Sequence, residues 1–278
     1  MAATGEGGTR GVHAFGVSRK QRLHLTALLI LLALLLTAIP LQAQSSGDNG
    51  DIDFDPGITQ AEFEQFSRLV GQAIYATPVE PAGSRGLLGF DIGVMATAVP
   101  VDTNATYWTR SVTDDFTISD HVAVPRLVVS KGLSVVNIAV SYAKVPDTDI
   151  SILGGSLDVP IINGGLVKPT LAVRGAYSTL QGVEELDLTT YGVELFLSKG
   201  FGPVTPYAAI GRARTDAEGR PFTGIPTGGA VPVEPLVDEF DSNRITVGVK
   251  ISLLLPKFVI EATQGEERSY AAKVSFGF

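Results

Sequence analysis

The sequence contains no cysteine, only three histidines and a single tryptophan among its 278 residues. Without cysteine the chain can form no disulfide framework and carry out no thiol catalysis, and it has no N-terminal cysteine to carry a lipid. Charged residues are also scarce, at 18%, and the 29 acidic residues outnumber the 21 basic ones. Because an acidic balance repels phosphate backbones, nucleic acid is disfavoured as a partner.

The chain also lacks an apolar run long enough for a spanning helix. Its longest, LTALLILLALLLTAI over Leu25–Ile39, has 15 residues, whereas a spanning helix needs roughly 18 or more. Basic residues within Arg19–Arg22 precede the run, and the small residue Ala43 follows it. This order is typical of a secretory signal peptide, so we expect residues 1–43 to be removed and the chain to be exported. The alternative is a retained anchor.

Removing residues 1–43 leaves 17 basic and 28 acidic residues, a net charge of −11. Residues 44–57, QSSGDNGDIDFDPG, have no apolar period and are expected to form an acidic linker. Residues 58–77 then place apolar side chains on one helical stripe, with a capping box at Thr59 and Glu62. We expect one amphipathic helix on the periplasmic side, as a cap or as a plug in the barrel mouth, with an interfacial helix as the alternative.

From residue 85 to 278 the apolar period changes to two, which is typical of β-strands with one apolar and one polar face. The final segment SYAAKVSFGF, for example, alternates Tyr270, Phe276 and Phe278 on one face with Lys273 on the other. We count ten such segments, within a range of eight to twelve. They lie near residues 86–99, 121–131, 133–145, 149–161, 166–179, 185–199, 203–215, 242–255, 257–265 and 267–278.

The connections between these segments alternate in length. Those after the second, fourth, sixth and eighth segments are tight, whereas the others include the long stretches 100–120 and 216–241. Short turns on one rim and longer loops on the other are typical of outer-membrane barrels, with the short rim in the periplasm. Because the number of antiparallel strands is even, the barrel begins and ends at the same rim, and the order of the connections makes this the periplasmic rim.

Charged residues occur in the middle of the apolar segments, always on the polar face. A soluble β-sandwich is the alternative fold, but charge at mid-strand favours a narrow barrel whose lumen holds opposite charges in pairs. Lipid outside demands a closed sheet, because every backbone group must find a partner. The expected lumen-lining charges are Asp91, Arg126, Asp158, Arg174, Glu194, Arg244, Lys250, Glu261 and Lys273.

The aromatic C-terminus resembles the signature that the barrel assembly machinery recognises in outer-membrane β-barrel proteins, and here Tyr270, Phe276 and Phe278 match it. The motifs GFDIGV and VPRLVVSKGL and the stretch from LAVRGAYS to AAIGR are similar to an uncharacterised family of Gram-negative outer-membrane barrels, over about residues 60–278. The resemblance implies an all-β transmembrane barrel in the outer membrane, with lipid and the assembly machinery as partners. It implies no activity.

Sites for metals and catalysis find little support. His121 is the only histidine after residue 43, which excludes two-histidine metal sites. Asp114, Asp115 and Asp120 lie near it, as in omptin-type barrel proteases, but a second acidic pair is missing. Acidic residues of DIDFDPGITQAE fall at calcium-loop spacing, but Pro56 occupies the position that needs glycine. We expect no enzyme activity, no metal and no cofactor.

The expected function is therefore a narrow or gated passage for small solutes, or a structural barrel. The second hypothesis is binding or adhesion at the cell surface through loops 100–120 and 216–241. The contacts would be Trp108, Phe116, Phe222 and the acidic residues Asp238, Glu239 and Asp241. An omptin-like hydrolase using His121 is the third.

Overall fold

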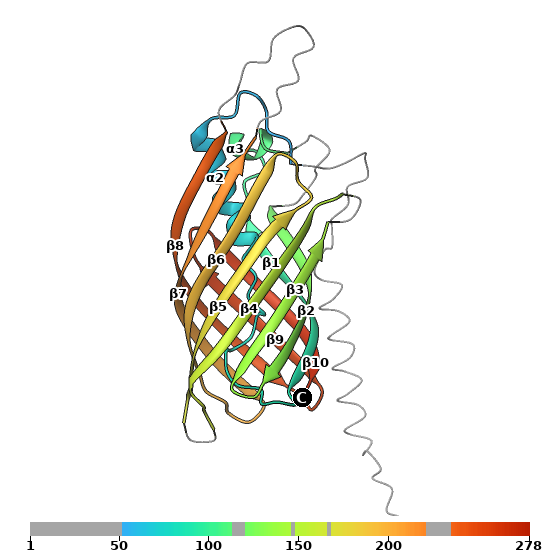
Figure 1. Ribbon diagram of the computed structural model, residues 1–278, viewed down its shortest axis with the longest axis vertical. Coiled ribbons are helices and arrows are strands. Elements are labelled where there is room, and N and C mark those ends of the chain that lie inside the picture. Colours follow the sequence, from blue (N-terminus) through green and yellow to red (C-terminus); the bar gives the residue numbers. More distant parts are fainter. Residues whose placement is uncertain (1–51, 113–119, 146–147, 166–167, 221–234) are drawn as a thin grey trace, which may run out of the picture. The chain divides into compact units, whose positions relative to one another are not determined.

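A computed structural model describes residues 52–112, 120–145, 148–165, 168–220 and 235–278. These residues form a closed antiparallel barrel of ten strands, which confirms the predicted fold and strand number (Figure 1). The strands are β1 Phe90–Pro100, β2 His121–Leu133, β3 Val136–Lys144, β4 Ser151–Ile162, β5 Thr170–Gln181, β6 Leu186–Ser198, β7 Val204–Gly219, β8 Leu236–Ser252, β9 Pro256–Gln264 and β10 Arg268–Gly277.

The ring closes between the first and last strands. Each strand pairs with its sequence neighbours, and β1 also pairs with β10 in a register that sets Met95 opposite Lys273 and Asp91 opposite Gly277. The backbone of Phe90 exchanges two hydrogen bonds with that of Phe278, each of 3.0 Å. A closed sheet leaves no strand edge unpaired, and this is the condition for crossing a bilayer with strands.

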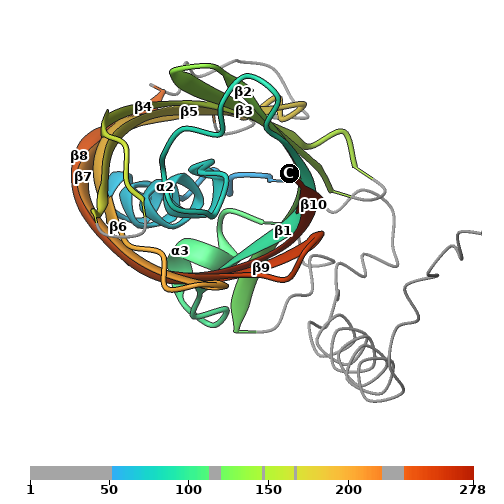
Figure 2. The same cartoon turned by 90° about the horizontal axis from the view of Figure 1, so that it is seen from below.

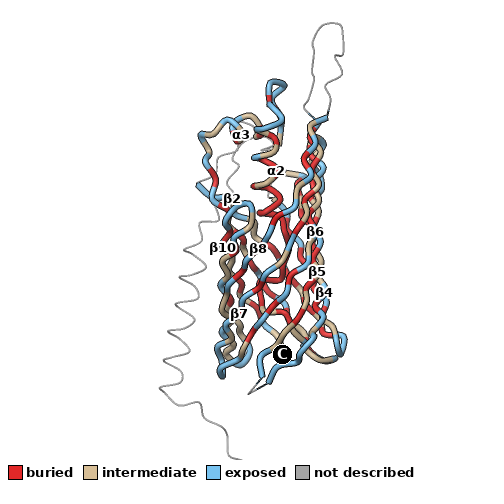
Figure 3. Tube along the Cα trace, turned by 90° about the vertical axis from the view of Figure 1, so that its left-hand side faces the viewer, coloured by how far each residue is buried: buried red, intermediate tan, exposed pale blue. Residues whose placement is uncertain are grey.

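The two faces of the strands differ in character, as the period of two predicted (Figure 3). Large apolar side chains on the outer face are exposed, including Val94, Val140, Val193, Ile210, Val247 and Ile260. Small and polar side chains fill the inner face, among them Ser130, Ser178, Thr190 and Thr246, which are buried. The molecule therefore presents its apolar surface outward and its polar groups inward, the reverse of a water-soluble barrel.

The connections define two rims. The short-turn rim comprises connections 134–135, 163–169, 199–203 and 253–255, and the long-loop rim comprises 101–120, 145–150, 182–185, 220–235 and 265–267. A short helix, α3 Thr106–Thr109, lies in the first long loop. This division follows the predicted alternation except at the connection 163–169, which is longer than the tight turn expected there and longer than 182–185 and 265–267 on the other rim.

Strands β7 and β8 extend farther toward the long-loop rim than the sequence predicted. Their added residues, 216–219 and 236–241, carry charges on the outer face, where Arg214 pairs with Asp216 and Glu239. The outer face is charged there, whereas the inner face carries Ala217, Leu236 and Phe240, so the apolar outer face ends although the backbone pairing continues to Gly219 and Leu236. The connection 220–235 is accordingly shorter than the expected 216–241.

Helix α2, Gln60–Ile74, lies inside the barrel near the long-loop rim (Figure 2). The predicted capping box is present, because Thr59 and Glu62 each accept a hydrogen bond from the backbone of the other. The hydrogen bond from the Thr59 backbone N–H is the largest of the contacts that lower the pKa of Glu62, to about 2. The apolar stripe, including Phe63 and Phe66, packs against Phe54 and Trp108. None of the described helices is long and apolar enough to cross a membrane.

The position of α2 differs from the expected one at the short-turn rim. Residues 75–89 run from the end of α2 to the start of β1 at the opposite rim, and about 15 residues of extended chain can span up to roughly 50 Å. Residues 52–89 thus thread the lumen from one rim to the other. At the long-loop rim Ile52 forms a bridge with Val112, and at the short-turn rim Gly89 meets Gly132. We call residues 52–89 the threading segment.

Candidate functional site

The structure places most of the nine predicted lumen charges inside the barrel with little contact to solvent. Seven are buried, and Lys250 and Glu261 are intermediate. The buried ones are Asp91, Arg126, Asp158, Arg174, Glu194, Arg244 and Lys273. Ionised groups cost free energy in such a place unless they are paired and hydrogen-bonded, so their partners decide what the lumen can do.

Arg174 and Asp158 form a bidentate pair between neighbouring strands. The guanidinium donates to both carboxylate oxygens, at 2.6 and 2.9 Å, and stacks 4.5 Å from the ring centroid of Phe196. Its remaining nitrogen donates to the backbone carbonyl of Glu80, at 3.0 Å. This pair therefore also holds the threading segment.

Glu80 is the centre of a second cluster and is not among the nine charges predicted to line the lumen. Its carboxylate pairs with Arg85 and, at 3.1 Å, with Lys273 of β10, and it accepts a hydrogen bond from Ser130. The only signal in the sequence is a lone acidic residue in the proline-containing stretch PVEPAG, which has no period to show which way its side chain points. The contact joins the threading segment to two walls of the barrel.

Asp91 continues this cluster toward the short-turn rim. It pairs with Lys257 at 2.8 Å and with Lys273 at 3.1 Å, and Ser275 donates to it at 3.2 Å. Because Lys273 bridges the two carboxylates, the pairs around Asp91 and Glu80 form one network.

Arg126 has a different kind of partner. It donates to the backbone carbonyls of Ala73 and Tyr75, at 2.5 and 3.3 Å, where α2 ends. The last carbonyls of a helix lack intrahelical partners and carry a partial negative charge, so a cation is favourable there. Arg126 thus fixes the end of α2 without a carboxylate.

The last cluster surrounds Arg244 on β8. This side chain lies 3.5 Å from Glu194, donates to Gln72 of α2 at 2.7 Å, and stacks 4.1 Å from the ring centroid of Tyr75. Gln72 in turn donates to Ser269 of β10 at 2.8 Å. Glu261, on β9, accepts a hydrogen bond from Tyr207 at 2.7 Å. Polar side chains of β8 and β10 therefore bind Gln72 and Tyr75 at the C-terminal end of α2.

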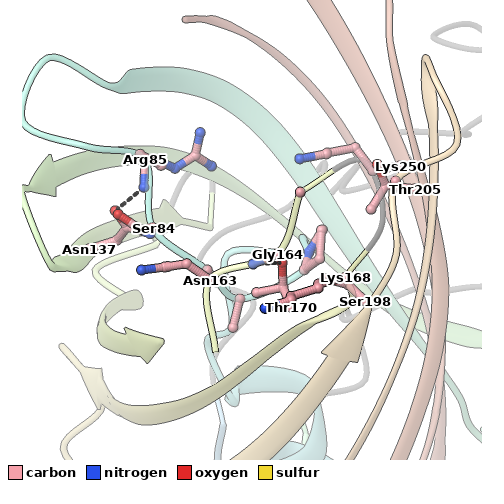
Figure 4. Close-up of a pocket in the computed structure, with 15 residues that line it drawn as sticks. Ser84, Arg85, Asn137, Asn163, Gly164, Lys168, Thr170, Ser198, Thr205 and Lys250 are labelled. Atoms are coloured by element: carbon pink, nitrogen blue, oxygen red, sulfur yellow. Dashed lines mark hydrogen bonds between the residues drawn. The ribbon is translucent and has the colours of Figure 1, made fainter. Parts of the chain in front are cut away.

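A cavity of about 470 Å³ opens at the short-turn rim, between the end of the threading segment and the turns of β4–β5 and β6–β7 (Figure 4). Lys250 and Arg85 extend into it from opposite sides. Its remaining polar lining comes mainly from Ser84, Asn137, Asn163, Lys168, Thr170, Ser198 and Thr205. No carboxylate belongs to this lining. We call this cavity the vestibule.

The residues of the predicted assembly signal, Tyr270, Phe276 and Phe278, are exposed on the outer face or at the end of β10. His121 is exposed at the start of β2, whereas Asp114 and Asp115 lie outside the described residues. Within the described ranges no group of three or more acidic or histidine side chains could hold a metal ion.

Two residues proposed as surface contacts for adhesion are buried. Trp108 packs on Phe66 of α2 with its ring centroid 6.1 Å away, and Asp238 accepts a hydrogen bond from Ser67 of α2. Both are less than a tenth exposed. These side chains hold α2 in the barrel, so they are not available to a partner, and the adhesion hypothesis loses them as contacts. Phe116 and Phe222 lie outside the part of the chain that the structure describes.

The sequence matches no protein-family model and no curated protein. Solved structures with a similar arrangement include the N-terminal β-barrel domain of Pseudomonas aeruginosa OprF, with 11% identity, a TM-score of 0.32, and coverage of 70% of this chain and 99% of that one. Ail, the attachment invasion locus protein of Yersinia pestis, is another, with 11% identity, a TM-score of 0.25, and coverage of 68% and 97%.

The network around Glu80 predicts that removing a buried carboxylate costs much more unfolding free energy than removing an exposed one. Replacing Glu80 with Gln keeps its shape but leaves Arg85 and Lys273 short of one buried negative charge, which we expect to cost about 3 kcal/mol of unfolding free energy. The matched variant Asp187→Asn removes a carboxylate from an exposed pair with Arg220 and should cost less than about 1 kcal/mol. Denaturant titration of both proteins in detergent compares the two costs, and equal losses would contradict the assignment.

Proposed function

We propose that the protein is an integral outer-membrane β-barrel that acts as a narrow, gated passage for small solutes, without enzymatic activity, and that the threading segment closes it. The observation that carries the proposal is a lumen with buried charges that a segment of the same chain threads from one rim to the other. Two further features support it: the outer surface suits lipid, and the contacts along the threading segment change in kind from one rim to the other.

The outer surface supports a position in lipid. On β8 the outward residues from Ile245 to Ile251 are apolar, whereas Asp241 and Glu239 beyond them are charged and exposed. The same change occurs between Ile210 and Arg212 on the paired strand β7. A charge on the lipid face costs about 2–4 kcal/mol at the bilayer midplane, so the charged ends are expected to project beyond the hydrocarbon.

The contacts of the threading segment fall into two parts. The helix is held near the long-loop rim by an apolar cluster that includes Phe54, Phe63 and Phe66, and burying each such ring is worth about 2 kcal/mol. Glu80, at the level of the apolar outer belt, is instead held by ion pairs and hydrogen bonds. In this proposal the extended stretch 76–89 is the movable gate, and α2 is its anchor.

The C-terminal end with Tyr270, Phe276 and Phe278 is proposed to serve as the signal for the barrel assembly machinery.

A purely structural barrel is the alternative function, and it differs from a passage in one respect. In a purely structural barrel, single substitutions at the gate should produce no conductance. Only deletion of the whole threading segment would then open the lumen, as an artefact.

The threading segment makes the orientation testable, because the chain has no native cysteine. With the short-turn rim in the periplasm, Asp53 at the long-loop rim faces the cell exterior. Intact cells carrying Asp53→Cys should react with a membrane-impermeant maleimide, while cells carrying Val135→Cys, exposed in a short turn, should react only after permeabilisation. The reverse pattern would contradict the orientation, and labelling of neither variant after permeabilisation would contradict the exposure of both sites.

Gating predicts that the intact protein conducts rarely in planar lipid bilayers. Glu80→Ala removes the contacts to Lys273 and Arg85, so we expect frequent openings, and deletion of residues 52–84 should give a persistent conductance. Asp187→Asn, on the outer face, serves as the control and should behave as the unaltered protein. Silence of the unaltered, Glu80→Ala and deleted proteins alike would overturn the proposal of a passage.

A further inference from the structure

The vestibule at the short-turn rim carries an excess of positive charge, although the chain as a whole is acidic. The groups gathered at this end of the lumen are five cations, Arg85, Lys168, Lys250, Lys257 and Lys273, and two carboxylates, Glu80 and Asp91. Asp158, another buried carboxylate of the lumen, is matched by Arg174. Cations therefore outnumber carboxylates by three in this group of described residues.

Lys250 carries one of these charges into the open space. Every ion pair of the cluster is made by Arg85, Lys257 or Lys273, and within the described ranges Lys250 has neither an ion pair nor a hydrogen bond from its ammonium group. The side chain instead points across the vestibule toward Arg85 (Figure 4). Lys168, on the β4–β5 turn, adds a third cation to the lining.

The rest of the lining is suited to an oxyanion. Amides of Asn137 and Asn163 and hydroxyls of Thr170, Ser198 and Thr205 can donate hydrogen bonds, and the lining contains no carboxylate to repel an anion. Charge-assisted hydrogen bonds from lysine and arginine to phosphate are among the strongest available to a protein. A lone phosphate would fill only a small part of about 470 Å³, which is within the usual size range of a pocket for a small organic molecule.

We propose that the vestibule is a binding site for a small organic solute that carries a doubly charged phosphate, with Lys250, Lys168 and Arg85 facing the phosphate. Two charges on the ligand would balance Lys250 and Lys168, the two lining cations that make no ion pair within the described residues. The site deepens the proposed function by naming a solute class at the mouth of the passage. Binding is measured on the closed barrel, so failure to bind and failure to conduct are separate results.

The test is calorimetric titration of the purified full chain in neutral detergent at low salt, with adenosine 5′-monophosphate as the probe and adenosine as its uncharged counterpart. We expect saturable binding of the monophosphate and none of adenosine. Lys250→Met should weaken binding about tenfold, because one charge-assisted contact is lost, and Lys250→Arg should largely retain it. Heat-modifiable mobility on gels verifies that each variant is folded.

Lys144→Met is the matched control, since it removes one exposed cation from the end of β3 near the other rim and should leave the affinity unchanged. Equal weakening by Lys250→Met and Lys144→Met, or no saturable binding of the monophosphate, would overturn the proposal. A lipid headgroup is the other source of a phosphate. Micelles doped with phosphatidylglycerol should not displace the monophosphate, and displacement would overturn the assignment to a free solute.

Discussion

The structure depends on how a narrow barrel with an apolar exterior neutralises the charges that it encloses. The wall alone does not achieve this. Arg126 faces no carboxylate within the described residues, and its charge is met by the backbone carbonyls at the end of α2. Lys273 shares Asp91 with Lys257 and needs the carboxylate of Glu80 as well. The threading segment thus supplies acceptors that the strands lack, and the closed state of the lumen follows from electrostatics as much as from shape.

This dependence explains why the two ends of the lumen differ. Near the long-loop rim the barrel is lined by apolar side chains and holds a helix through ring packing, which is strong and resists displacement. Near the short-turn rim the segment is extended and its contacts are charged. Lys250 and Lys168, which make no ion pair within the described residues, line the vestibule there. Ion pairs exchange partners with an incoming anion more readily than packed rings separate. An anion entering from the short-turn rim would therefore meet the part of the segment that we propose as the gate.

Much of the fold could be predicted from the sequence because alternate residues of a barrel strand point to opposite faces, one toward lipid and one toward the lumen. The ten strands, the two rims and the charges such as Asp158 and Arg174 all follow from that period and from the rule that lipid excludes charge. The same rule failed at the ends of β7 and β8, where the outer face is charged. There the backbone continues to pair beyond the apolar belt, and no alternation marks it.

Glu80 and Arg85 were missed for a related reason. They lie in PVEPAGSR, a stretch with no helical or strand period, so nothing in the sequence indicated that its side chains face a lumen. The position of α2 was likewise hidden, because an apolar stripe shows that a helix packs on something apolar without showing at which rim. Contacts across more than 150 residues, such as Glu80 with Lys273, are set by the closure of the barrel and become visible only in three dimensions.

The central claim is that the N-terminal segment runs inside the barrel, and a disulfide tests it most directly in a chain without cysteine. A Cβ placed on Gly71 of α2 would lie 3.5 Å from the Cβ of Thr215 on the inner face of β7, within the range that a disulfide spans. Membranes containing Gly71→Cys with Thr215→Cys should show nearly complete cross-linking under mild oxidation, detected as a linked peptide by mass spectrometry. Two free thiols under those conditions, in a folded barrel, would contradict the account.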